Sequence, residues 1–123
     1  MSSHQLVRRY TEGCEDLACE DVVHSELARA KRKYAQGRKL FEQKNYFDCL
    51  MKLSKALDSF NTMEPPSADL KEKLPRVYRI VKDCYLLFAS CYIRMDQQKH
   101  AENCLKLILK VEPSDAQALY LRG

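Results

Sequence analysis

Cysteine and histidine residues near the N-terminus are the first whose type and spacing could do chemistry. Cys14, Cys19 and His24 follow one another at intervals of five positions, and thiolate and imidazole groups are preferred ligands of zinc. A structural zinc site needs a fourth ligand, and this spacing is not one of the common zinc patterns. The sequence therefore predicts no metal site and no bound cofactor.

Catalytic motifs are missing from the sequence as well. It contains no glycine-rich phosphate loop, no H-E-x-x-H and no G-x-S-x-G, each of which places reactive groups in a defined geometry. No nucleophilic residue lies at a spacing that would indicate a catalytic pair with any of the three histidines, His4, His24 and His100. We therefore expect a protein that is not an enzyme and has no catalytic residues.

A basic run is the strongest charge feature. Several cations on one helix could follow the phosphates of a nucleic acid. However, Glu26 and Glu42 flank the run, the net charge is only +4, and no aromatic platform accompanies the cations. A solvated helix face or an acidic protein partner is therefore favoured over nucleic acid. The run comprises Arg29, Lys31, Arg32, Lys33, Arg38 and Lys39.

Apolar residues recur every three or four positions along much of the chain, a pattern typical of amphipathic helices. The first such helix is predicted over about residues 23–43, and Asn45 is a candidate cap for the next one. The buried stripe of that second helix is expected to comprise Phe47, Leu50, Met51, Leu53, Leu57 and Phe60.

Ser67 is expected to cap a short helical piece, and Pro75 suits the first turn of a long helix. The stripe of this long helix comprises Val77, Ile80, Val81, Cys84, Leu87, Phe88, Cys91 and Met95. Free cysteine packs as a small hydrophobic residue, so structural burial is predicted for Cys49, Cys84, Cys91 and Cys104.

Composition supports an all-α fold. Only three Gly and four Pro occur among 123 residues, too few turn residues for a sandwich of short strands. No apolar run approaches the length of a membrane span, and the N-terminus has no apolar signal core. We therefore expect a soluble intracellular protein, cytoplasmic and/or nuclear, with no membrane partner.

Part of the sequence recurs with a period of 34 residues. Leu119 follows Tyr85, and Gly123 follows Ala89, by this interval. The pattern Tyr85-x2-Phe88-Ala89-x2-Tyr92, followed by Ala101-x3-Leu105 and then Pro113, resembles the tetratricopeptide repeat family, whose unit is a pair of antiparallel helices. The small residues Ala89 and Ala101 would let the two helix axes approach to roughly 8–10 Å.

An earlier unit fits the same pattern through Gly37, Tyr46, Cys49, Leu53 and Ala56-Leu57. Ala89 follows Gly37 by 52 positions, so about 18 residues are added to one period of 34. The resemblance implies a helix-hairpin solenoid with an extended first helix in the second unit. Its parts are an N-terminal segment (1–22) that could form a short packing helix, and a repeat domain (23–123) with unit 1 at about 27–61, an insertion at about 61–80, unit 2 at about 82–115 and the start of unit 3 at 116–123.

In this family the first helix of each unit lines a concave groove. The resemblance implies a non-catalytic scaffold or adaptor subunit of a multiprotein assembly, for example one of the ubiquitin-ligase type. Its groove would bind a protein or peptide segment that is apolar, or mixed with some acidic character. The groove residues would be Lys31, Tyr34, Arg38, Phe41, Asp83, Leu86, Ser90, Ile93, Arg94, Gln117 and Tyr120.

Two alternatives to this scaffold remain open. Some relatives are co-chaperones that bind an acidic C-terminal tail through a carboxylate clamp of Lys, Asn and Arg side chains. The corresponding positions here hold no clamp residue, so a co-chaperone would have to use a non-standard groove; these positions are Tyr34, Arg38, Leu87, Gln117 and Leu121. The other alternative is a nucleic-acid-associated adaptor that uses the basic run.

The third unit has no second helix in this sequence. Terminal units of a solenoid need a polar outer face, whereas Leu119 and Tyr120 open a unit that stops at Gly123. Leu105, Ile108 and Leu109 are therefore expected to be poorly covered. Two expectations follow from this: the chain is an N-terminal piece of a longer repeat protein, or it self-associates through this exposed C-terminal face.

Overall fold

The computed structural model of the chain describes residues 17–60 and 65–123, without the side chains of residues 17–24, and all regular structure in these ranges is α-helical. The all-α prediction is therefore confirmed for this part of the chain. The first helix begins six residues before the predicted start at 23, so residues 17–22 of the predicted N-terminal segment belong to α2. The rest of that segment, where a short packing helix was predicted, lies outside the described residues. The helices are α2 (Leu17–Glu42), α3 (Tyr46–Asp58), α4 (Ala68–Lys73), α5 (Pro75–Arg94), α6 (Gln98–Val111) and α7 (Ala116–Arg122).

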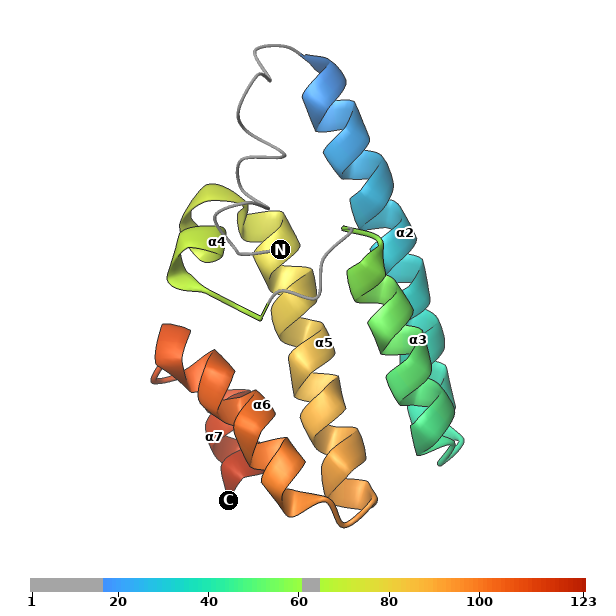
Figure 1. Cartoon of the computed structure of the whole chain (residues 1–123), viewed down its shortest axis with the longest axis vertical. Coiled ribbons are helices and arrows are strands. Elements are labelled where there is room, and N and C mark those ends of the chain that lie inside the picture. The colour runs from blue at the N-terminus through green and yellow to red at the C-terminus, as the bar shows by residue number, and fades with distance from the viewer. Residues whose placement is uncertain (1–16, 61–64) are drawn as a thin grey trace.

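The long helices form two antiparallel hairpins, α2 with α3 and α5 with α6 (Figure 1). Helix α5 lies at the centre and contacts each of the other described helices. In Figure 1, α3 and α6 lie toward the viewer, while α2 and α7 lie behind them. Helices α2, α5 and α7 run in the same direction and form one layer.

The turns of the two hairpins have the same backbone geometry. Lys44 has a φ angle of 63° and Asp96 one of 60°, the left-handed conformation that non-glycine residues seldom adopt. The Lys44 N–H donates to the Phe41 carbonyl at 2.9 Å, and the Asp96 N–H donates to the Ile93 carbonyl at 3.2 Å. The two turns are therefore equivalent at an offset of 52 positions (96 minus 44), the same offset that relates Gly37 to Ala89 in the sequence.

Small residues allow the paired helices to approach closely. A Cβ atom added to Gly37 would lie 3.2 Å from Cδ2 of Leu53, a side chain that is fully buried. In the second hairpin, Ala89 and Ala101 are both 0% exposed and belong to one core cluster. The contacts predicted at these three positions are therefore present.

The core follows the predicted stripes in α5 and departs from them in α3. Cys49, Cys84 and Cys91 are fully buried, as predicted, and Cys104 is half-buried. Burial raises the pKa of the Cys84 thiol to about 12 and that of the Cys104 thiol to about 11. Both groups are therefore protonated and unreactive at neutral pH.

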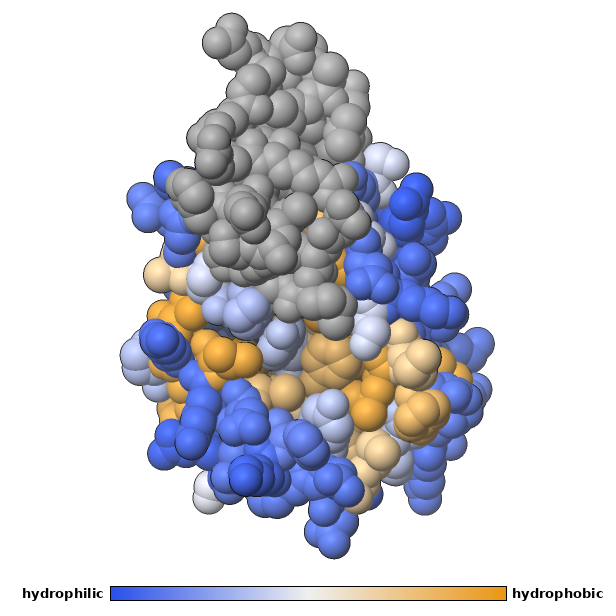
Figure 2. Space-filling view, viewed as in Figure 1, coloured by the Kyte–Doolittle hydropathy of each residue, from blue (hydrophilic) through white to orange (hydrophobic). Residues whose placement is uncertain are grey.

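The predicted burial of Phe47 and Met51 is wrong. They are 65% and 51% exposed, because the part of α3 that contacts α2 and α5 is a narrower strip made by Cys49, Leu53 and Leu57. Figure 2 shows hydrophobic surface over the lower part of α3 and the adjoining part of α5, and mostly hydrophilic surface over the lower part of α6. Asn45 occupies the N-cap position of α3, as predicted, but its side chain makes no cap hydrogen bond.

The segment between the hairpins contains the short helix that the sequence predicts. The Ser67 hydroxyl oxygen accepts a hydrogen bond from the Leu70 N–H at 3.1 Å and so caps α4. Pro75 occupies the first turn of α5, where its missing N–H leaves no helical bond unmade. Leu70 is fully buried in the same core cluster as Val77 and Val81 of α5, so α4 is packed against the long helix.

The expected poor coverage of α6 is wrong. Leu105 and Ile108 are both 0% exposed and Leu109 is half-buried, because Ala118 of α7 packs into their cluster. At this end of the structure the exposed apolar side chains lie instead on α7, where Leu119 is 42% and Tyr120 81% exposed. Within the described ranges, no helix combines the length and the apolar character needed to cross a membrane.

The close contact in the second hairpin gives a stability prediction. Ala89→Leu inserts three carbon atoms into a fully buried position, and overpacking of this kind costs about 1–3 kcal/mol. Chemical denaturation should show this loss in the free energy of unfolding. The matched control is Ala35→Leu at an exposed position of α2. Equal unfolding free energies for the Ala89→Leu variant and the wild type would contradict the assigned contact.

Candidate binding groove

The candidate site is the surface over the layer formed by α2, α5 and α7. Side chains spaced by three, four or seven positions share one face of a helix. Helix α2 contributes Tyr34, Arg38 and Phe41 to this surface, and α5 lies between it and α7. Two adjoining hollows occur here, and side chains of all three helices line each of them.

The first hollow is polar and has a volume of about 270 Å³. Arg38 Nη1 donates a long hydrogen bond of 3.5 Å to Tyr34 Oη. Burial raises the pKa of the Tyr34 hydroxyl, and the hydrogen bond with Tyr34 raises the pKa of the Arg38 guanidinium. Burial also raises the pKa of the Asp83 carboxyl. The lining residues are Tyr34, Arg38, Asp83, Leu86, Leu87, Ser90 and Gln117.

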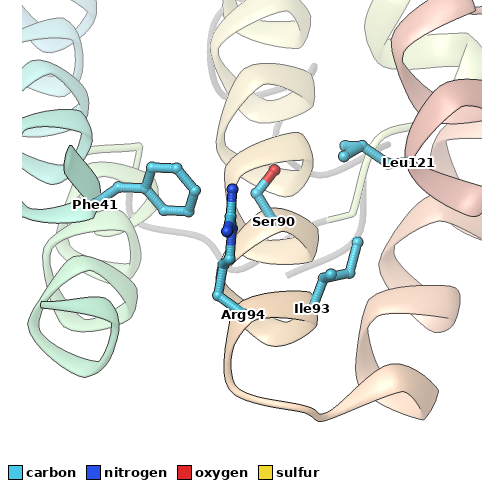
Figure 3. A pocket seen from close by; sticks show the side chains of 5 residues that line it. All are labelled: Phe41, Ser90, Ile93, Arg94 and Leu121. Atoms are coloured by element: carbon cyan, nitrogen blue, oxygen red, sulfur yellow. The ribbon is translucent and has the colours of Figure 1, made fainter. Parts of the chain in front are cut away.

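The second hollow is larger, at about 430 Å³, and more of its lining is apolar. Figure 3 shows Phe41 on one side, Ser90, Ile93 and Arg94 on α5 in the middle, and Leu121 on the other side. Ser90 lines both hollows, and its hydroxyl donates to the Leu86 carbonyl at 3.1 Å. Because this hydroxyl proton is used within the helix, the hollow offers a ligand mainly apolar contacts flanked by one guanidinium.

Most of the residues that the sequence predicts for the groove come together here. Six of the eleven line the polar hollow: Tyr34, Arg38, Asp83, Leu86, Ser90 and Gln117. Phe41, Ile93 and Arg94 line the apolar one. Lys31 and Tyr120 are exposed and line neither of these two hollows. Leu86 is only 4% exposed, so it forms part of the floor of the polar hollow and its side chain is largely inaccessible to a ligand.

The groove prediction did not include Leu87 and Leu121, although both line a hollow. They are 34 positions apart (121 minus 87), and the sequence comparison places them at equivalent positions of successive units. That equivalence was the available signal. Residues at equivalent positions have the same exposure only if neighbouring helices cover them to the same extent. Here they do not, because Leu87 is buried and Leu121 is half-buried.

A polar cluster fixes α7 in position as the third wall. Glu112, which follows α6, accepts a hydrogen bond of 2.7 Å from the Tyr78 hydroxyl of α5. The same carboxylate pairs with Lys71 of α4 and with Lys82 of α5, each at 3.1 Å. Lys82 also pairs with Asp115 at 3.0 Å. These contacts tie α4 and the α6–α7 connection to the central helix.

Asp115 has a second role in the cluster, because one of its carboxylate oxygens accepts from the Ala118 N–H at 2.9 Å and caps α7. The hydrogen bond from Tyr78 and the neighbouring lysines lower the pKa of Glu112 to about 2. Burial, together with the nearby carboxylate, raises the pKa of Tyr78. Glu112 is therefore ionised, and Tyr78 protonated, throughout the neutral range.

The basic run of α2 is largely solvent-exposed, including Arg29, Lys31, Arg32 and Lys39. Arg38 is the member of the run that reaches the polar hollow. Among the residues that the structure describes, no group of three or more His, Cys, Asp or Glu side chains could hold a metal ion. Cys14, Cys19 and His24, the candidate zinc ligands, lie outside the described side chains.

No protein-family model, no curated protein and no solved structure matches this chain. The groove is therefore interpreted from the residues of this chain alone.

The depressed pKa of Glu112 predicts a pH-dependent stability. A carboxyl group whose pKa falls from 4.5 to about 2 on folding stabilises the native state above its unfolded value, and this contribution is lost as the pH falls through the folded value. We expect Glu112→Gln to lower the free energy of unfolding at neutral pH by about 1–3 kcal/mol. The difference from the wild type should shrink from about pH 5 downward and be smallest near the folded pKa of about 2.

Denaturant titrations across this pH range measure the difference directly. Glu102→Gln is the matched control, because Glu102 is exposed on α6 and surface ion pairs contribute little to stability. A Glu112→Gln difference that stays constant with pH would show that the carboxylate is not engaged in the folded protein.

Proposed function

We propose that this chain is a tetratricopeptide-type repeat protein and serves as a non-catalytic scaffold or adaptor subunit of a multiprotein assembly. In this proposal, a segment of a partner protein binds in the groove over α2, α5 and α7. The observation that carries the proposal is that three parallel helices line two adjoining hollows, and most of the lining side chains are exposed or half-buried. The equivalent turns at Lys44 and Asp96 support the repeat assignment, because they give both hairpins the same register.

The chemistry of the groove favours a protein segment as the ligand. A segment that lies along α5 would meet polar groups at Asp83 and Gln117 and then apolar groups at Phe41 and Leu121. Grooves between helices bind amphipathic helices or extended segments in this way, by taking a few anchor side chains and leaving the rest solvated. The hollows adjoin at Ser90, so one continuous segment can occupy both.

Site-specific photocrosslinking tests this proposal. A photoreactive amino acid replaces Gln117, which is exposed at the edge of the polar hollow. We expect a defined protein to crosslink from this position in cells. The matched control replaces Lys106, which is exposed on α6 and does not line either hollow. The same yield and the same products from both positions would contradict groove binding.

Charge reversal provides the quantitative test. Arg38→Glu and Arg94→Glu each reverse an exposed charge at one of the hollows, and such surface substitutions usually change stability by less than about 0.5 kcal/mol. We expect both variants to melt within a few degrees of the wild type and to lose the Gln117 crosslink. Full retention of the crosslink in both variants would place the binding surface elsewhere.

A further inference from the structure

The Asp83 carboxylate lies near several cations, but none of the described ones forms an ion pair with it. It is half-buried on the groove side of α5, and among the described residues its side chain makes no hydrogen bond or ion pair. Lys82 is engaged by Glu112 and Asp115, and Arg38 is bonded to Tyr34. Arg79, one turn earlier on α5, is exposed and acts on Asp83 through its charge without forming an ion pair. A carboxylate withdrawn from water is stabilised by a cation that arrives with a ligand.

The Arg94 guanidinium lies on the same face of α5 as Asp83, at the C-terminal end of the helix. Arg94 is exposed in the last turn of α5, beside the apolar hollow, and makes no ion pair with any residue that the structure describes. The apolar hollow begins one turn before it, where Phe41 and Leu121 lie on either side of α5 (Figure 3). The groove therefore presents a negative group, an apolar hollow and a positive group in that order.

The spacing of these groups can be estimated from helix geometry. Arg94 follows Asp83 by eleven positions (94 minus 83), which is about 16 Å along an α-helix. An extended segment covers that distance with about five residues. A helical segment needs about eleven residues.

We propose that the groove selects a protein segment with three side chains in series: a basic one that pairs with Asp83, an apolar one that enters the hollow between Phe41 and Leu121, and an acidic one that pairs with Arg94. This inference rests on the proposed function and names the chemistry of the bound segment. Charge complementarity at both ends fixes the direction in which the segment lies along α5.

Selection from a random-peptide phage library on the full chain tests this proposal. Peptides enriched on the wild type should contain a Lys or Arg and an Asp or Glu on opposite sides of an apolar residue. Selection on Asp83→Arg should replace the basic residue with an acidic one. The peptide selected on the wild type should bind Asp83→Arg at least about tenfold more weakly in fluorescence anisotropy.

Matched variants separate the charge effect from loss of folding. Glu102→Arg makes the same change of charge at an exposed position of α6 outside the groove, and it should leave the affinity unchanged. If Asp83→Arg does not fold, Asp83→Asn retains the shape of the side chain and should still weaken binding. Equal affinity of the peptide for Asp83→Asn and the wild type would overturn the proposed pairing.

The failure of this inference is distinguishable from failure of the proposed function. Enriched peptides that need Arg38 but contain no basic residue would overturn the inference and leave groove binding intact. Enriched peptides that bind Arg38→Glu as well as the wild type would overturn both. Light scattering that shows a dimer dissociated by Asp83→Arg would make a second copy of the chain the occupant, which also overturns the inference.

Discussion

The contact between small residues where paired helices meet is the constraint on which the rest of the structure depends. At Gly37 there is no room for a side chain without a shift of Leu53, and Ala89 and Ala101 are fully enclosed in the second hairpin. Helices that touch through such residues approach closely, and larger side chains are displaced to the flanks of the contact. Those flanks are where α2, α5 and α7 meet, so the shape of the groove follows from contacts on the other side of the same helices.

Features that depend on local sequence were predictable. The Ser67 cap and Pro75 in the first turn of α5 need only a few neighbouring residues, and the structure contains both. The offset of 52 between the hairpins was also visible in the sequence, because the same small residue must recur wherever the same close contact is made. The boundary of α2 and the exposure of Phe47 and Met51 depend on which neighbours reach those turns, and periodicity alone does not contain that information.

The candidate site shows the same division. Nine groove residues could be predicted because the same helical periodicity applies to α2, α5 and α7. The spacing of residues along a helix determines which of them share a face. The Glu112 cluster was not predicted, since it joins Lys71, Tyr78 and Lys82 to a residue 30 to 41 positions later. Each of these residues, read alone, is an ordinary surface or stripe residue. Only the packing of α4 and of the α6–α7 connection against α5 brings them together.

That cluster has a consequence for the dynamics of the groove. Glu112 accepts from donors on α4 and α5 and stands in the connection that leads into α7. Local opening of α4 would separate Lys71 from the Glu112 carboxylate, which lies in the connection before α7. Separation of α7 from the core would, in turn, move Glu112 away from Lys71. Segments linked in this way open together as a cooperative unit with a shared free energy. We therefore expect the amide hydrogens of the inserted helix and of the third wall of the groove, although far apart in sequence, to exchange with a common free energy of opening.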